Sequence, residues 1–188
     1  QPQLVGLRCL SLFQTQFKYL AKVIRAKMPS VFLIGGGPYP SSSYLEIVGS
    51  YVDLAVIGEG EKTFVELIGS LNETKTLPTD LVGTAALVNG EIKKNESRPV
   101  LENIDELPAP NYDLINVKDY KGTYNHAYLS NDKCVFLESS RGCTYKCYYC
   151  HAALSKTVRR RSPDLVIEEM SEHYHKRGSR DFVFVDDI

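Results

Sequence analysis

Short apolar runs alternate with segments of helical periodicity along the first half of the chain. The runs LVGLRCLSL (4–12) and VFLI (31–34) have the length and composition of buried strands. Between them, FKYLAKVIRAKM (17–28) repeats apolar residues at the spacing of one helix face. VDLAVI (52–57) predicts a third strand, and TFVELIGSL (63–71) predicts a further helix. Strand–helix units in succession predict an α/β fold with a parallel, doubly wound sheet that helices cover on both faces.

Glycine-rich turns follow the second and third of these strands. GGGPYPSSS (35–43) leads into a helix expected over about residues 44–50, and GEGE (58–61) precedes the next helix. Ligands of parallel sheets bind beyond the carboxyl ends of the strands, where both turns fall, and glycine lets the backbone approach a bulky ligand. The alternative is that these glycines only form the turns. Neither turn matches the dinucleotide-binding or phosphate-loop pattern, which argues against nicotinamide and nucleoside triphosphate ligands.

The chain changes character after this sheet. TAALVNGEIKKN (84–95) carries Asn89-Gly90, a favoured two-residue hairpin turn, between two short runs. We expect this hairpin to close a first domain over residues 1–95. Residues 96–133 are polar, contain several prolines and show no sustained period, so they predict an ordered connector.

The remaining residues, 134–188, predict a strand–loop–helix–strand unit. CVFLE (134–138) is a strand candidate, and a long loop over 139–161 follows it. Ser162-Pro163-Asp164 then has the features of a helix start, and FVFV (182–185) is a second apolar strand. Strands joined in this way are parallel, and two of them cannot bury both faces. Because a complete barrel of this kind takes about 250 residues, we expect the first strands of a (β/α) barrel that the chain end cuts short.

Composition and charge exclude several classes of partner. The 188 residues include 22 Lys and Arg against 23 Asp and Glu, so no global attraction to nucleic acid or to an anionic membrane is expected. No apolar run approaches the roughly 18 residues of a membrane span, and no signal segment is evident, which favours a cytoplasmic protein. KTVRRR (156–161) is short and lacks aromatic neighbours, so it predicts a solvated or substrate-facing loop.

Five cysteines at uneven spacing favour a reducing compartment and a metal site. Cys143, Cys147 and Cys150 follow the pattern C-x3-C-x2-C in the long loop. Thiolates are soft ligands for zinc, copper(I) or iron–sulfur clusters. A four-iron cluster held by three cysteines would leave one iron open to a substrate or cofactor. The alternatives are a zinc site completed by His151, and cysteines that only occupy a core.

The stretch RGCTYKCYYC (141–150) resembles the signature of radical S-adenosylmethionine (SAM) enzymes, with Tyr149 as the aromatic residue before the last cysteine. The resemblance implies that the three cysteines hold a [4Fe-4S] cluster, that SAM chelates the open iron, and that Tyr149 lies beside the adenine. One electron from the cluster would then cleave the sulfonium, and the resulting 5′-deoxyadenosyl radical would take hydrogen from the substrate. Asp186 and Asp187 stand where this family binds the SAM amino group or ribose; the alternative is a solvent-exposed turn.

The first half is similar to the cobalamin-binding domain and connector of B12-dependent radical SAM proteins, through LVGLRCLS, VFLIGGGPYP, VDLAVIGEGEKTFVELI and ELPAPNYDLI. RSPDLVIEEM and FVFVDDI resemble the first helix and second strand of their barrel. The resemblance implies a Rossmann-like, B12-binding sheet followed by a partial TIM barrel. No D-x-H-x-x-G motif is present, so the lower axial ligand is not assigned. Facing the corrin would be Gly35, Gly36, Gly37 and Pro38 in one turn, and Gly58, Glu59, Gly60 and Glu61 in the next.

This resemblance implies an enzyme that transfers a methyl group from methylcobalamin to an unreactive carbon of a small-molecule substrate. Members that form or rearrange rings share the same domains, so these reactions stay open. An external one-electron donor of the flavodoxin or ferredoxin type is also implied. Two alternatives remain: a radical SAM enzyme whose first domain is a scaffold without cobalamin, and a non-catalytic iron–sulfur or zinc module. A ferredoxin-like carrier would need a fourth cysteine for its cluster, and none is evident.

Overall fold

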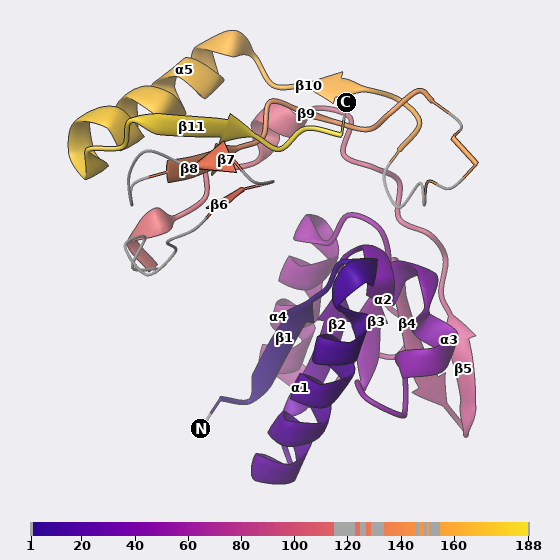
Figure 1. Ribbon diagram of the computed structural model, residues 1–188. Coiled ribbons are helices and arrows are strands. Elements are labelled where there is room, and N and C mark those ends of the chain that lie inside the picture. Colours follow the sequence, from indigo (N-terminus) through magenta and orange to yellow (C-terminus); the bar gives the residue numbers. More distant parts are fainter. Residues whose placement is uncertain are drawn as a thin grey trace. The chain divides into compact units, whose positions relative to one another are not determined.

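The computed structural model describes residues 2–114, 134–145, 147–148, 150 and 155–187, and the backbone of 123–124 and 127–128. The chain divides into two compact units (Figure 1): the strands described in the first form one five-stranded sheet, and those described in the second form three two-stranded sheets. The first comprises Gln1–Val100 and Cys147–Leu154, and the second comprises Leu101–Lys146 and Ser155–Ile188. The domain limits expected from the sequence stay a prediction. None of the described helices is long and apolar enough to cross a membrane.

The sheet of the first unit has five strands in sequence order. The first three are parallel, with Val5 opposite Leu33 and Ile34 opposite Leu54, and the last two run antiparallel. The predicted parallel strands are confirmed, whereas the antiparallel direction of the fourth strand was not predicted. The strands are β1 (Leu4–Arg8), β2 (Phe32–Gly36), β3 (Leu54–Val56), β4 (Thr84–Val88) and β5 (Glu91–Lys94).

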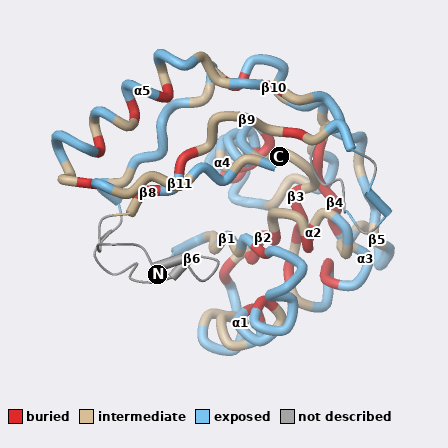
Figure 2. The backbone as a smooth tube through the Cα atoms, turned by 45° about the horizontal axis from the view of Figure 1, so that its top comes forward, coloured by how far each residue is buried: buried red, intermediate tan, exposed pale blue. Residues whose placement is uncertain are grey.

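Helices cover both faces of this sheet, as the sequence predicts. Along β2, Leu33 packs in one buried cluster with Phe17, while its neighbour Ile34 packs in another with Leu67. Successive strand residues point to opposite faces, so the two clusters lie on either side of the sheet. Figure 2 shows the buried positions along the strands. The helices are α1 (Gln14–Lys27), preceded by a 3₁₀ turn at Ser11–Phe13, then α2 (Pro38–Ser42), α3 (Tyr44–Ile47) and α4 (Glu61–Thr74).

The helix after β2 begins earlier than expected. Residues 35–43 were predicted to form a turn, but α2 starts at Pro38, and Gly37 is its N-cap with φ of 93°. Proline fits the first helical position because its fixed φ suits the helix and its missing N–H needs no partner there. The prediction of a turn over residues 38–42 is therefore wrong, and β2 extends through Gly36, two residues beyond the predicted strand.

The hairpin predicted at Asn89-Gly90 is present between β4 and β5. Both residues have positive φ, 52° for Asn89 and 87° for Gly90, as a type I′ turn requires. Val88 pairs with Glu91 across the turn. A two-residue turn fixes the register of the two strands, so this short sequence determines how the sheet ends.

The second unit contains the predicted strand–helix–strand element. Strand β8 (Cys134–Leu137) pairs in parallel with β11 (Asp181–Phe184), with Val135 opposite Phe182. They are joined through α5 (Pro163–Glu172), whose last turn continues as a π-helix over His173–Arg177. Gly178, with φ of 69°, ends this helix. Val135 and Leu137 are buried, as is Val166 of α5.

From Leu101 onward, the connector belongs to the second unit. Its 3₁₀ turns span Ile104–Glu106 and Tyr112–Leu114, and its strands β6 (Thr123–Tyr124) and β7 (Ala127–Tyr128) pair antiparallel. The Tyr112 hydroxyl donates to the Phe136 carbonyl at 2.9 Å, and its ring meets the His173 ring edge-on, with centroids 4.4 Å apart. Burial lowers the pKa of His173, as does the nearby Arg177 cation. The His173 imidazole that packs against Tyr112 is therefore neutral at neutral pH.

Candidate functional site

The segment that carries the three cysteines begins at a glycine with no room for a side chain. Gly142 is buried and has φ of 92°, in the left-handed region that favours glycine. A Cβ placed on it would lie 2.3 Å from the Thr157 carbonyl oxygen and 2.8 Å from that of Ser155. The next residue, Cys143, donates its backbone N–H to Ser155 at 3.1 Å. We refer to residues 141–150 as the cysteine loop; residues 155–157 support its start.

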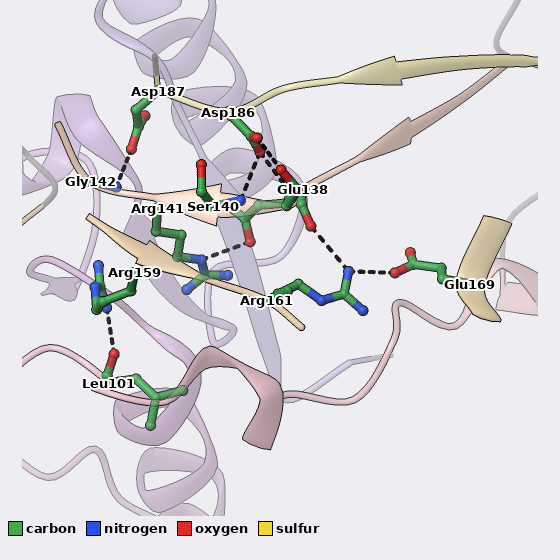
Figure 3. Close-up of polar contacts among 11 residues, drawn as sticks. Leu101, Glu138, Ser140, Arg141, Gly142, Arg159, Arg161, Glu169, Asp186 and Asp187 are labelled. Carbon is green, nitrogen blue, oxygen red and sulfur yellow. Dashed lines mark hydrogen bonds and ion pairs between the residues drawn. The ribbon is translucent and has the colours of Figure 1, made fainter. Parts of the chain in front are cut away.

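Two short strands lead the chain into and out of this region. β9 (Ser140–Arg141) pairs antiparallel with β10 (Arg159–Arg160). Arg159 is buried and donates to the Leu101 carbonyl at 2.6 Å. Arg161 donates to the Glu138 carbonyl at 3.1 Å and to the Glu169 carboxylate at 2.6 Å (Figure 3). The prediction of a solvated or substrate-facing loop over 156–161 is therefore wrong for Arg159 and Arg161, because both side chains have partners inside the unit.

The three candidate ligands are free thiols, and the first of them is less exposed than the other two. Cys143 is half-buried, whereas Cys147 and Cys150 are exposed. The Cys150 N–H donates to the Cys147 carbonyl at 3.1 Å, which makes a tight turn between these two. Cys143 belongs to the second unit, and the other two belong to the first. Among the described residues, no three His, Cys, Asp or Glu side chains lie close enough together to hold a metal ion.

The chemistry of this donor set nevertheless fits an iron–sulfur cluster. Accessible thiols on one loop are the ligands that such clusters use. For the other two cysteines, Cys9 and Cys134, burial raises the pKa of each thiol above its ordinary value. A raised pKa favours the protonated thiol over the thiolate that binds metal. Tyr149 and His151 lie outside the described residues, so their roles stay predictions.

Two aspartates follow β11 and reach the start of the cysteine loop (Figure 3). Asp186 Oδ1 accepts the backbone N–H groups of Ser139, at 2.7 Å, and Ser140, at 3.0 Å, while Oδ2 accepts the Ser139 hydroxyl. Asp187 Oδ2 accepts the Gly142 N–H at 2.7 Å. Partial burial would raise the pKa of Asp186, but the hydrogen bonds from Ser139 and Ser140 together lower it. The Asp186 carboxylate is therefore ionised at neutral pH.

The three glycines at the end of β2 and directly after it do not share one environment. A Cβ on Gly35 would lie 3.3 Å from Phe17 and 3.4 Å from Ile47, on the face covered by α1 and α3. A Cβ on Gly37 would lie 3.0 Å from the Cys9 carbonyl oxygen. Packing within the protein therefore accounts for these two glycines.

Gly36 and Gly58 have open surroundings at the carboxyl ends of β2 and β3. A Cβ on either would meet no described heavy atom within 4 Å. The Gly58 N–H donates to Ser41 Oγ at 3.0 Å, which ties the turn after β3 to α2. These two positions are the ones where the absence of a side chain leaves room for a ligand. The other candidates here are Pro38, which begins α2, Gly60, which is the N-cap of α4, Glu61, which begins α4, and Glu59 between the two glycines of that turn.

Curated relatives match almost all of the chain, although no protein-family model does. An uncharacterised methyltransferase of Pyrococcus horikoshii, PH0819, is 31% identical over 99% of this chain and 40% of its own length. The anaerobic magnesium-protoporphyrin IX monomethyl ester cyclase of Synechocystis is 25% identical over 89% and 33%. The cobalamin-dependent radical SAM methyltransferase TokK of Streptomyces tokunonensis is 25% identical over 90% and 25%. The chain thus spans well under half the length of these relatives.

Solved structures of two enzymes share the fold over the whole chain. The cobalamin-dependent SAM radical enzyme OxsB, solved with aqua-cobalamin bound, matches with a TM-score of 0.78 at 20% identity, over 26% of its own chain. The radical SAM methyltransferase TsrM of Kitasatospora setae, solved with cobalamin and a [4Fe-4S] cluster, matches with a TM-score of 0.70 at 17% identity, over 38% of its chain. The predicted fold class, a B12-binding type sheet followed by the first strands of a radical SAM barrel, is confirmed.

The relatives and solved structures that this chain resembles include proteins described as cobalamin-dependent radical SAM enzymes. The resemblance predicted from the sequence is confirmed: the chain is related to cobalamin-dependent radical SAM methyltransferases such as TokK, and the similarity to PH0819 extends over 99% of this chain.

Proposed function

We propose that this chain provides the cobalamin-facing sheet and the cluster-binding loop of a B12-dependent radical SAM enzyme. The observation that carries the proposal is the C-x3-C-x2-C loop that follows β8. The same chain places a glycine-edged parallel sheet before that loop, in the order expected for this class. The accessible thiols of the loop and the open space at Gly36 and Gly58 are the features that such cofactors need.

In this proposal, Cys143, Cys147 and Cys150 hold a [4Fe-4S] cluster, and SAM binds its open iron. A cluster held there supplies the electron that cleaves the SAM sulfonium. Tyr149 would lie beside the adenine, as the resemblance implies.

Cobalamin is proposed to bind at the carboxyl ends of β2 and β3, and it supplies the methyl group for transfer to an unactivated carbon of a small-molecule substrate. Gly36 and Gly58 leave room for the corrin there, while Gly35, Gly37 and Pro38 shape the first turn and Glu59, Gly60 and Glu61 shape the second. An external flavodoxin- or ferredoxin-type donor would supply the electron. Ring formation is a second candidate reaction, because a curated relative is named as a cyclase.

The cluster is tested by anaerobic reconstitution with iron, sulfide and hydroxocobalamin, followed by electron paramagnetic resonance (EPR) of the reduced protein with and without SAM. We expect a four-iron signal that changes when SAM is added, because SAM would bind the open iron. Replacing Cys147 with Ala should abolish SAM cleavage. Because Cys147 is exposed, this truncation removes a ligand without removing core packing.

The matched control is Cys134→Ala, which removes a half-buried thiol outside the loop and should leave the SAM-dependent EPR change intact. Stoichiometric zinc in place of iron would contradict the proposal, as would retained SAM cleavage in the Cys147→Ala protein. A cluster whose EPR signal does not respond to SAM would favour the electron-transfer alternative.

The cobalamin site is tested by filling the open space at Gly36. Gly36→Val should weaken hydroxocobalamin binding by at least about tenfold, because two methyl groups would enter the proposed corrin site. A tenfold loss of affinity corresponds to about 1.4 kcal/mol of binding free energy. The fold should tolerate the change, since Gly36 lacks a positive φ and no described heavy atom lies within 4 Å of its Cβ position. Equilibrium titration followed by absorbance measures the affinity.

Gly6→Val is the matched control, because Gly6 also lies in the parallel sheet with no described heavy atom within 4 Å of its Cβ position. It is in the interior of β1 rather than at the carboxyl end. Equal affinities for the two variants would place cobalamin elsewhere or favour the cobalamin-free scaffold.

A further inference from the structure

The turns after β8 and β11 are joined by four hydrogen bonds that involve two adjacent carboxylates. Asp186 accepts three of them, from the Ser139 N–H, the Ser139 hydroxyl and the Ser140 N–H. Asp187 accepts the fourth, from Gly142. All donors belong to residues 139–142, which immediately precede Cys143. The hydrogen-bonded residues are far apart in sequence: 47 positions separate Ser139 from Asp186, and 45 separate Gly142 from Asp187. Only the parallel pairing of β8 with β11 brings them together.

Three of these four hydrogen bonds come from backbone N–H groups of the protein. Both oxygens of Asp186 already accept hydrogen bonds, and the side chain is half-buried. The N–H groups at the end of a strand otherwise lack a ladder partner, so a carboxylate that accepts two of them fixes the direction in which the chain leaves β8. Gly142 has a backbone conformation that other residues rarely adopt, and the bond from Asp187 holds its N–H in that orientation.

We propose that Asp186 and Asp187 are positioning residues that hold the start of the cysteine loop, so that the Cys143 thiol is presented to the cluster. This assigns them a role through residues 139–142, in addition to or in place of direct contact with SAM. It rests on the proposed function, because the thiol is positioned for the cluster. Outer partners of this kind orient metal ligands, and their loss typically lowers metal affinity by about tenfold to a hundredfold.

Replacement of Asp186 by Ala and by Asn separates the two roles. Ala removes every acceptor from the three donors. Asn keeps one carbonyl oxygen that can accept both N–H groups, and its amide can donate to the Ser139 hydroxyl oxygen, but it removes the negative charge. A positioning role therefore predicts damage from Ala and rescue by Asn. A charge contact with the SAM amino group predicts that both variants fail to respond to SAM.

The experiment uses the full chain, reconstituted anaerobically with iron and sulfide. For each variant we would measure the rate of iron loss to a chelator, the EPR change on adding SAM, and amide hydrogen exchange of residues 138–143 in the protein without iron. We expect Asp186→Ala to lose iron about tenfold faster than the wild type and to exchange these amides faster. Asp186→Asn should remain close to the wild type in both measurements.

Glu168→Ala, at an exposed position on α5, is the control for carboxylate removal. Ser139→Ala removes one of the three donors and should accelerate iron loss less than Asp186→Ala does, with exposed Ser171→Ala as its control. If Asp186→Ala lowers the overall melting temperature, the rate of iron loss in Ser139→Ala, compared with that in Ser171→Ala, still measures the positioning effect in a folded protein.

Normal iron retention in Asp186→Ala, combined with loss of the SAM response in both Asp186 variants, would overturn the inference in favour of a SAM ligand. Equal iron loss in the Ala and Asn variants would also overturn it, because charge would then matter rather than hydrogen bonding. Failure of the wild type to form a SAM-responsive cluster is a different outcome: it refutes the proposed function. The exchange measurement then still shows whether Asp186 orders residues 138–143.

Discussion

Gly142→Ala is expected to abolish stable cluster binding and to destabilise the second unit by about 3 kcal/mol or more, the sum of left-handed backbone strain and overpacking. The added methyl group would lie 2.3 Å from the Thr157 carbonyl oxygen, and the obstacle is backbone that cannot rotate away. Either the strand leading into the loop or residues 155–157 must move. Both shifts displace Cys143, whose N–H is bonded to Ser155. Iron content after reconstitution and urea unfolding of the iron-free protein measure the two effects.

Gly90→Ala is the control for backbone strain alone. Gly90 has φ of 87°, similar to the 92° of Gly142, but a Cβ there would meet no described heavy atom within 4 Å. We expect a cost of about 1–2 kcal/mol and normal iron content. If Gly142→Ala cost no more than Gly90→Ala and retained its iron, residues 155–157 would not constrain the loop as described.

Arg161→Met is expected to destabilise the protein by about 3–5 kcal/mol, the usual cost of removing one partner of a buried ion pair. The side chains of Arg161 and Glu169 are 11% and 4% exposed, so the substitution would leave a carboxylate in the interior without its cation. The Glu138 carbonyl would lose a donor as well. Urea unfolding followed by circular dichroism gives the change in the free energy of unfolding.

The double variant Arg161→Met/Glu169→Leu removes both charges and should recover most of this loss, because well-packed apolar residues can replace a buried pair. Asp113→Asn is a control for an exposed pair. Asp113 bonds Arg177 but its side chain is 80% exposed, so we expect a loss below about 1 kcal/mol. A double variant as unstable as Arg161→Met would mean that packing or the Glu138 contact, rather than the unpaired charge, determines the loss.

Local patterns determined most elements of this fold. Apolar runs located β1, β2, β3, β8 and β11. The interior of β2 and all of β3 are buried, as expected because a strand covered on both faces needs a continuous apolar sequence. Asn89-Gly90 located the hairpin because its two residues accept positive φ. Proline was harder to interpret. Pro38 was taken as part of a turn although the same residue type correctly predicted the helix start at Pro163, where a serine and an aspartate flank it.

In the candidate site, too, the sequence predicted some residues, and only the structure identified the others. Cysteine spacing alone predicted the three thiols, since a short motif carries its ligands on one loop. Sequence did not single out Gly142, although a glycine directly before the first cysteine was the available signal. It also could not distinguish Gly36 from Gly35 and Gly37, because the difference depends on Phe17, Ile47 and the Cys9 carbonyl, which lie on other elements.

By itself, the sequence determined the order of strands and helices, the hairpin and the thiol motif, all of which depend on residues close together in the chain. Only the tertiary structure decided that Arg161 is buried against Glu169 and that Asp186 holds residues 139 and 140. A charged residue has the same local signature whether it meets water or a distant partner. What decides between the two is strand pairing such as that of β8 with β11, which brings together segments more than forty residues apart.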